Sequence, residues 1–223
     1  MKAVALFLAI LLALLALPLL FPAQQGPTPQ PQPDGGLPWQ IEKLADGTTR
    51  VFGLVPGRTS FDEARRQIAG EPQVALLVAP GESGALEAYY DSFAAQFVTG
   101  RLVLSLDSTF AQRERMAARA RKVEYLEGTT RRVHLGEADL IEAGRAVVSA
   151  VSFIPAANLD EQIVLQRFGV PAERIRSSAH TEHFLYPELG LDLQLDAKGK
   201  ELLQYVAPRE FARLRDPLQN VAR

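Results

Sequence analysis

The hydrophobic pattern of the chain changes abruptly after its first 23 residues. Residues 3–23 are all apolar or proline, and as a helix this stretch would rise about 31 Å at roughly 1.5 Å per residue, which matches a bilayer core. We therefore expect residues 1–23 to form a signal anchor, a single transmembrane helix. A cleaved secretory signal is the alternative, but its apolar stretch usually runs only about 7–15 residues, and Phe21 stands where the cleavage site needs a small residue.

Both interpretations export the rest of the chain. Lys2 is the only basic residue before Lys43, so the positive-inside tendency places the N-terminus in the cytoplasm. In a bacterial cell we expect a single-pass inner-membrane protein with its bulk in the periplasm, or a secreted or periplasmic protein if the signal is cleaved. Residues 24–38 contain five prolines and three glycines, which indicates a semi-rigid linker.

Residues 39–122 carry the pattern of a first folded unit. Two β-prone runs around Ala45-Asp46-Gly47 indicate a hairpin. Ser60-Phe61-Asp62-Glu63 has the form of a capping box and predicts a helix that Gly70-Glu71-Pro72 ends. Four β-prone runs follow, at residues 73–79, 85–91, 93–98 and 101–106.

The same order returns within residues 123–223. Asn158-Leu159-Asp160-Glu161 indicates a helix start and Gly169-Val170-Pro171 its end. Further β-prone runs follow, at residues 173–178, 181–186, 189–196 and 200–206. We therefore predict an α+β protein of two tandem units, each a helix plus an antiparallel sheet, behind an N-terminal transmembrane helix. Two unrelated segments that share common capping chemistry are the alternative.

A basic segment follows the strands of the first unit. Residues 108–122 are predicted to form a helix that begins at the pair Thr109 and Gln112 and carries five cations against one acid. The simplest interpretation is a solvated helix whose cations lie toward the negative end of its dipole. The functional alternative is a docking face for an acidic partner or for anionic lipid headgroups. Its candidate binding residues are Arg113, Arg115, Arg119, Arg121 and Lys122.

Composition and motifs narrow the classes of function. The chain has 24 Lys+Arg against 26 Asp+Glu and no cysteine, which argues against nucleic-acid binding and excludes disulfides, thiolate metal sites, a catalytic thiol and a lipid-modified cysteine. The three histidines are His134, His180 and His183. The spacing of His180 and His183 is not that of a zinc protease, and on a strand they would point to opposite faces. We expect no metal, no cofactor and no catalytic residue.

One segment resembles a known family of envelope proteins. Leu54-Val55-Pro56-Gly57-Arg58-Thr59, followed by Ser60-Phe61-Asp62-Glu63-Ala64, Ile68 and Gly70-Glu71-Pro72, is similar to the Gly-x-Thr helix signature of the SmpA/OmlA family, the small lipoprotein of the outer-membrane β-barrel assembly machine. The resemblance implies helices against a short antiparallel sheet, and a tandem version resembles the β-lactamase-inhibitor protein architecture. The chain lacks the lipidation cysteine of the family, so the resemblance carries over a fold and a binding role but no partner.

These observations predict a non-catalytic, membrane-anchored, exported binding or assembly module of the bacterial cell envelope. Its partner would be an envelope protein or peptide, and the membrane would be reached through the N-terminal helix. A periplasmic hydrolase that uses His180, His183 and nearby carboxylates is one alternative, and it requires these groups to converge within hydrogen-bond reach. A structural spacer between envelope layers is another, and it predicts no concave apolar patch.

Overall fold

The computed structural model describes residues 36–81, 84–120, 122–126 and 130–221. The predicted anchor at residues 1–23, most of the predicted linker at 24–38, and Arg121 lie outside these ranges. Within the described ranges, no helix is both long and apolar enough to cross a membrane.

The described strands form one ten-stranded sheet and one small hairpin. The order in the large sheet is β6-β7-β3-β4-β5-β8-β12-β11-β10-β9, and all of its neighbouring pairs are antiparallel. Its strands are β3 (Gln73–Val78), β4 (Ala85–Ala95), β5 (Val98–Leu106), β6 (Lys122–Tyr125), β7 (Arg131–His134), β8 (Val148–Pro155), β9 (Glu173–Arg176), β10 (Thr181–Tyr186), β11 (Leu191–Asp196) and β12 (Leu202–Val206). The hairpin pairs β1 (Glu42–Lys43) with β2 (Thr49–Arg50).

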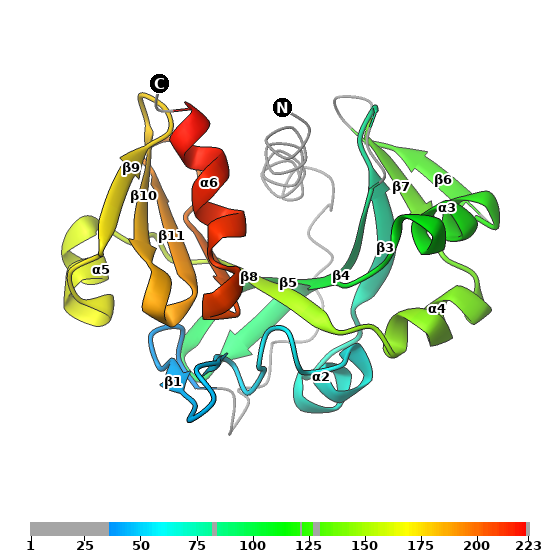
Figure 1. The fold of residues 1–223 in the computed structure, drawn as a ribbon, viewed down its shortest axis with the longest axis horizontal. Helices are drawn as coiled ribbons and strands as arrows, with labels where there is room; N and C mark the ends of the chain where they lie inside the picture. The colour runs from blue at the N-terminus through cyan, green and yellow to red at the C-terminus, as the bar shows by residue number, and fades with distance from the viewer. Residues whose placement is uncertain (1–35, 82–83, 121, 127–129, 222–223) are drawn as a thin grey trace.

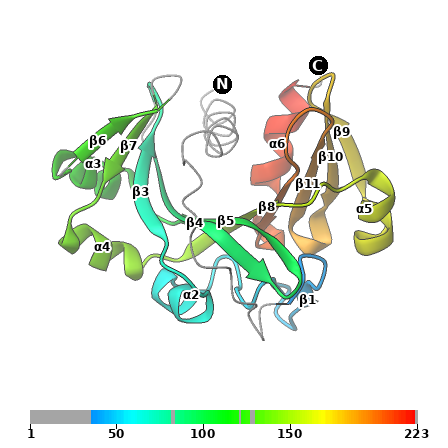
Figure 2. The same ribbon diagram turned by 180° about the vertical axis from the view of Figure 1, so that it is seen from behind.

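The sheet curves so that its two ends rise as arms on either side of β5 and β8 (Figure 1). We call β6, β7, β3 and β4 the first arm, and β12, β11, β10 and β9 the second arm. The face that each arm turns toward the other is the inner face, and the opposite face is the outer face. Figure 2 shows the same two arms from behind.

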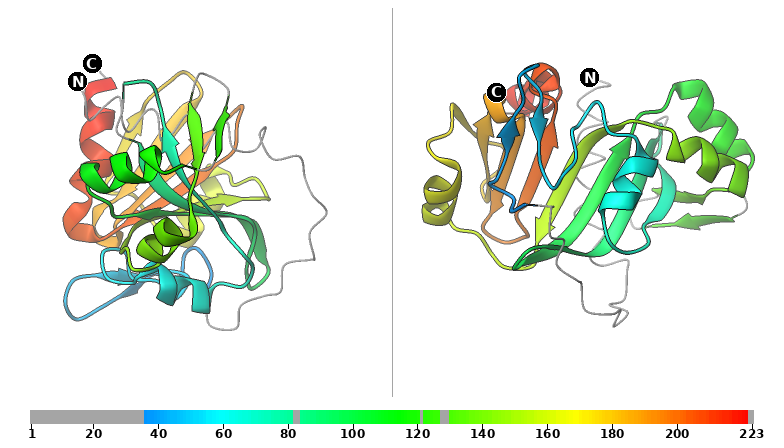
Figure 3. Two further views of the ribbon diagram at one scale, coloured as in Figure 1. Left: turned by 90° about the vertical axis from the view of Figure 1, so that its right-hand side faces the viewer. Right: turned by 90° about the horizontal axis from the view of Figure 1, so that it is seen from below.

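Helices cover the two faces unequally. On the outer face lie α2 (Phe61–Gln67), α3 (Phe110–Ala118), α4 (Glu137–Gly144) and α5 (Glu161–Phe168). On the inner face α6 (Ala212–Val221) packs against the second arm. Figure 3 shows α2 and the β1–β2 hairpin on the outer face, near the place where the arms meet. Two short 3₁₀ helices, η2 (Pro187–Leu189) and η3 (Pro208–Glu210), flank the last two strands.

Strand alternation builds the main core on the outer face. Successive side chains of a strand point to opposite faces, so Leu86, Ala88 and Tyr90 of β4 join the outer core while Glu87 and Tyr89 face inward. This core continues through both arms as a single cluster of buried apolar side chains.

An aromatic cluster lies where the arms meet. The Phe52 ring centroid is 5.1 Å from that of Phe93, 5.4 Å from that of Phe153 and 5.8 Å from that of Tyr205. These are edge-to-face arrangements, the geometry that aromatic pairs prefer. Phe93, Phe153 and Tyr205 come from β4, β8 and β12, so the cluster ties both halves of the sheet together.

A smaller core fixes α6 to the inner face of the second arm. Phe211, Leu214 and Leu218 pack against Ile175, Leu185 and Val206. Their spacing of three and four residues forms one stripe along the helix. The stripe supports α6 as a ten-residue helix that includes Pro217.

The prediction of an α+β protein with two tandem units is wrong. The protein is mostly β, and a single sheet runs through both halves. The cause is β8, because Phe153 of this strand pairs with Leu102 of β5 on one side and with Leu203 of β12 on the other. The predicted strand boundaries within residues 85–106 are also shifted. Ser92 lies at a bulge inside β4 rather than in a turn, β4 continues to Ala95, and β5 begins at Val98. Three strands, β3 to β5, therefore follow α2, whereas four strands, β9 to β12, follow α5.

The predicted helix starts are confirmed in two cases and corrected in a third. Ser60 with Glu63 and Thr109 with Gln112 both form complete capping boxes. The third helix start is capped by Asp160 rather than Asn158. The predicted helix at residues 108–122 ends early, because α3 stops at Ala118 and β6 begins at Lys122.

Candidate functional site

A row of three residues crosses the inner face of the first arm. Ala75 of β3 pairs with Glu87 of β4 on one side and with His134 of β7 on the other. Directly paired residues of an antiparallel sheet point to the same face. The small side chain of Ala75 therefore separates a carboxyl group from an imidazole.

A cavity of about 440 Å³ lies beside the first residues of β3. Gln73 and Val74 precede Ala75, the residue at which the pairing of β3 with β7 ends, and this leaves a gap in the sheet. Side chains from α2 and α4 reach the gap from the outer face. The apolar walls are Phe61, Val74, Ala75, Leu77, Leu135 and Leu140.

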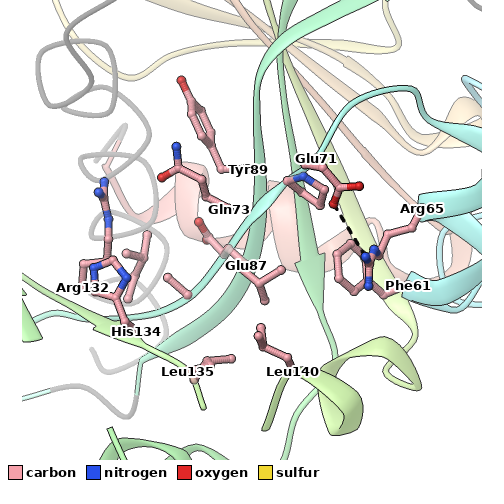
Figure 4. Close-up of a pocket in the computed structure, with 14 residues that line it drawn as sticks. Phe61, Arg65, Glu71, Gln73, Glu87, Tyr89, Arg132, His134, Leu135 and Leu140 are labelled. Carbon is pink, nitrogen blue, oxygen red and sulfur yellow. Dashed lines mark ion pairs between the residues drawn. The ribbon is translucent and has the colours of Figure 1, made fainter. Parts of the chain in front are cut away.

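Figure 4 shows Glu87 between the two groups of charged residues that line the cavity. On one side, Arg65 pairs with Glu71 at 3.7 Å. On the other, Arg132 and His134 lie 3.6 and 3.0 Å from carboxylate oxygens of Glu124. Each of these three side chains therefore has an acidic partner within the chain.

Glu87 differs from every other charged residue of the cavity. The residue is 5% exposed, and among the described residues no hydrogen bond or ion pair reaches its carboxyl group. Burial raises the pKa of Glu87 to about 7, since a charged carboxylate is poorly solvated in an apolar site. Glu87 can therefore change charge near neutral pH.

The neighbouring groups keep their charge states over a wider pH range. The Lys122 ammonium group and the His134 imidazole beside its carboxylate lower the pKa of Glu124 to about 2. Burial and the hydrogen bond that its hydroxyl donates to Asp91, 2.8 Å long, raise the pKa of Tyr89 well above its usual range. A perturbed carboxyl group in an apolar cavity is a recognised mark of a functional site.

The candidate docking residues on the basic segment have partners within the chain. Arg115 lies 3.3 Å from Glu142, and Arg119 pairs with Asp139; both acids belong to α4. Arg113 donates to Ser108, 3.3 Å to its hydroxyl, and Lys122 of β6 lies 2.5 Å from Glu124. Arg121 lies outside the described residues. The docking face therefore stays a prediction. Within the chain, the acidic surface that α3 contacts is α4.

The three histidines lie in three different environments. His180 is exposed in the turn before β10, His183 is fully buried in β10, and His134 lines the cavity of the first arm. His180 and His183 do not share a site; instead His183 contacts Asp192 and Ser177. Within the described residues, no group of three or more His, Asp or Glu side chains could hold a metal ion.

The sequence alone predicts only part of the cavity. The alternation in β4 shows that Glu87 faces away from the apolar residues Leu86, Ala88 and Tyr90. The pairing of β7 with β3, which brings His134 opposite Ala75, joins residues far apart in the chain, and no local pattern specifies it.

Comparison of the chain with protein-family models, with curated proteins and with solved structures finds no match. The proposed function therefore rests on the geometry of the cavity.

Proposed function

We propose that this protein is a binding module that receives a basic side chain of a partner polypeptide in the cavity of its first arm. The observation that carries the proposal is the Glu87 carboxyl group, which is buried and has no partner among the described residues. An unpaired buried charge is costly, and a cation from outside would remove that cost. Such binding makes and breaks no covalent bond.

The walls of the cavity fit the rest of a lysine or arginine side chain. Lysine and arginine bury their hydrocarbon stems along apolar surface while the charged end finds a polar partner. Leu77, Leu135 and Leu140 supply that surface beside Glu87. Arg65, Arg132 and His134 are already paired with acids, so Glu87 is the acid of the cavity that is left to recognise a cation.

The proposed setting is the cell envelope. The apolar block at residues 3–23 and the proline-rich stretch at 24–38 support an exported module held near the inner membrane. The resemblance of residues 54–72 to the SmpA/OmlA signature supports the same setting and a partner that is an envelope protein or peptide.

Calorimetric titration of the full chain with a matched pair of peptides tests the proposal. One short extended peptide carries a single lysine, and the other carries norleucine, which keeps the stem and lacks the charge. We expect the lysine peptide to bind at least about tenfold more tightly, which is about 1.4 kcal/mol. The preference should be larger at pH 8 than at pH 6, because Glu87 is ionised above about pH 7.

Two variants complete the test. Glu87→Gln should abolish the preference for lysine, whereas Glu114→Gln, a substitution of an exposed carboxylate on α3, should leave it unchanged. Equal affinity for the two peptides in the wild-type protein, or a lysine preference that survives Glu87→Gln, would contradict the proposal.

A further inference from the structure

A serine, a histidine and an aspartate are connected in series in the second arm. The Ser177 Oγ atom lies 3.0 Å from His183 Nε2, and His183 Nδ1 lies 3.0 Å from both carboxylate oxygens of Asp192. Ser177 directly follows β9, His183 belongs to β10 and Asp192 to β11. Two adjacent strands and the turn that follows a third therefore supply one residue each.

The register of the strands explains why the three side chains meet. His183 pairs with Ile175 of β9, so Ser177, two residues further along, points to the same face. Asp192 pairs with Leu185, two residues beyond His183 on β10. All three side chains thus belong to the inner face, on which α6 packs against Ile175 and Leu185.

The gradient of burial along the series matches the roles that acyl transfer requires. Asp192 is 1% exposed and His183 is 0% exposed, while Ser177 is half-buried at the turn. A carboxylate on Nδ1 holds the imidazole so that the Nε2 lone pair faces the hydroxyl. The series therefore runs from a buried acid, through an oriented base, to the hydroxyl of a half-buried serine.

The Ser177 hydroxyl is not needed to build the turn. Its neighbour Ser178 does that work, because the Ser178 hydroxyl accepts hydrogen bonds from the amides of His180, at 3.1 Å, and Thr181, at 3.0 Å. Among the described residues, His183 is the one hydrogen-bond partner of the Ser177 hydroxyl. One serine thus supports the backbone while the next one faces the imidazole.

We propose that Ser177, His183 and Asp192 form a second site, which hydrolyses carboxylic esters and is separate from the cavity of the first arm. The Ser177 oxygen attacks the ester carbonyl while its proton passes to His183 Nε2. The carbon–oxygen bond to the alcohol breaks, and His183 returns the proton to the leaving alkoxide. Water then attacks the acyl-serine with His183 as the base, which releases the carboxylic acid and restores the Ser177 hydroxyl.

The turn beside Ser177 lies at the surface, because Ser178, Ala179 and His180 are exposed. Acetyl esters have the smallest common acyl group, so they are the substrates with which the proposed hydrolysis is tested. The proposed site is catalytic, whereas the sequence predicts a non-catalytic protein. It supplies the nucleophile that the hydrolase alternative lacks when it uses His180 and His183 alone.

Labelling of the folded full chain with a fluorophosphonate tests this proposal directly. The probe reacts with serines that an adjacent base activates, and peptide mass spectrometry then locates the label. We expect label on Ser177 and none on Ser178, and hydrolysis of p-nitrophenyl acetate that falls to the buffer rate in Ser177→Ala. Ser92→Ala, which changes an exposed serine of β4, should keep both the label and the rate.

Two further variants distinguish catalysis from a structural hydrogen-bond network. Ser177→Cys keeps a nucleophile and should still be acylated by the ester, with a pH profile shifted toward that of a thiol. Asp192→Asn should lower the rate by about 10³-fold or more through loss of the correct imidazole tautomer, with circular dichroism confirming that the protein stays folded. A folded wild-type protein that takes no label, or a label that persists in Ser177→Ala, would overturn the proposal.

Discussion

Glu87 and His134 face the same side of the sheet as the two cross-strand partners of Ala75. The pair is held apart by one methyl group, and the space above that methyl group is part of the 440 Å³ cavity. The cavity therefore depends on the size of residue 75 as much as on the charge of residue 87. This dependence allows the space and the charge to be tested separately.

Filling the cavity should block binding without removing any charge. Ala75→Leu places a larger side chain between Glu87 and His134, and we expect it to weaken binding of the lysine peptide at least about tenfold. Because the added atoms enter an existing cavity, the free energy of unfolding should change by less than about 1.5 kcal/mol. Calorimetric titration and urea denaturation measure the two effects, and unchanged affinity would place the peptide elsewhere.

Glu87 should make the protein less stable as the pH rises. Its pKa is raised from 4.5 to about 7 in the folded state, so the folded protein binds a proton that the unfolded chain releases between these values. The cost is absent below about pH 4.5 and complete above about pH 7, and it amounts to about 3 kcal/mol.

Urea denaturation at pH 5 and pH 8 measures this cost. Glu87→Gln should be more stable than the wild-type protein at pH 8 and should lose the part of the pH dependence that lies between these values. Glu114→Gln serves as the exposed control. A wild-type stability difference that persists in Glu87→Gln would assign the effect to another group.

Arg119 should matter more for folding than its neighbour Arg115. The side chain of Asp139, the partner of Arg119, is 2% exposed, whereas that of Glu142, the partner of Arg115, is 32% exposed. Arg119→Ala leaves a buried carboxylate without its cation and should cost about 2 kcal/mol. Arg115→Ala should cost less than about 1 kcal/mol, and equal losses in thermal or urea denaturation would refute this difference.

This difference also affects how the docking prediction for α3 should be tested. Charge reversal at Arg119 would disturb α4 as well as any partner surface. Arg115→Glu is the cleaner variant, because its partner Glu142 remains partly solvated. Salt-sensitive loss of an acidic partner in that variant would support docking, and unchanged capture would favour a solvated helix.

Gly100 should tolerate no side chain. A Cβ atom at this position would lie 2.3 Å from the carbonyl oxygen of Ile154 and 2.6 Å from the Phe153 ring. Both groups belong to β8, so Gly100→Ala should destabilise the protein by about 1–3 kcal/mol. Gly199→Ala, where the nearest atom is the flexible Asp196 side chain at 3.2 Å, should cost less, and the midpoint of urea denaturation compares the two.

Local chemistry in the sequence predicts two of the helix starts. The helix starts at Ser60 and Thr109 are predicted because each hydroxyl group lies three residues before a carboxylate or an amide side chain. The structure contains both helix starts. These signals depend on neighbours within one helical turn. The bulge after Tyr90 was missed because a polar residue within a strand gives the same pattern as a turn.

Long-range pairing could not be predicted in the same way. Nothing near Phe153 specifies that it lies between Leu102 and Leu203, so one sheet was expected to be two. The candidate site could not be predicted for the same reason, because the cavity forms only when β7 pairs with β3 in the observed register. Ser177 was missed although it lies close to His183 in the chain, because only the β9–β10 pairing brings its hydroxyl to the imidazole.

The position of β12 has a consequence for the order in which the sheet can assemble. Synthesis delivers the chain from its N-terminus, so β5 is present when β8 emerges, whereas β12, the other partner of β8, is the last strand of the sheet. Until Val206 is available, the middle of the sheet presents an open edge that other chains can pair with. Truncation after Asp196 would make that exposed edge permanent, and we expect such a product to aggregate rather than to fold as half of the protein.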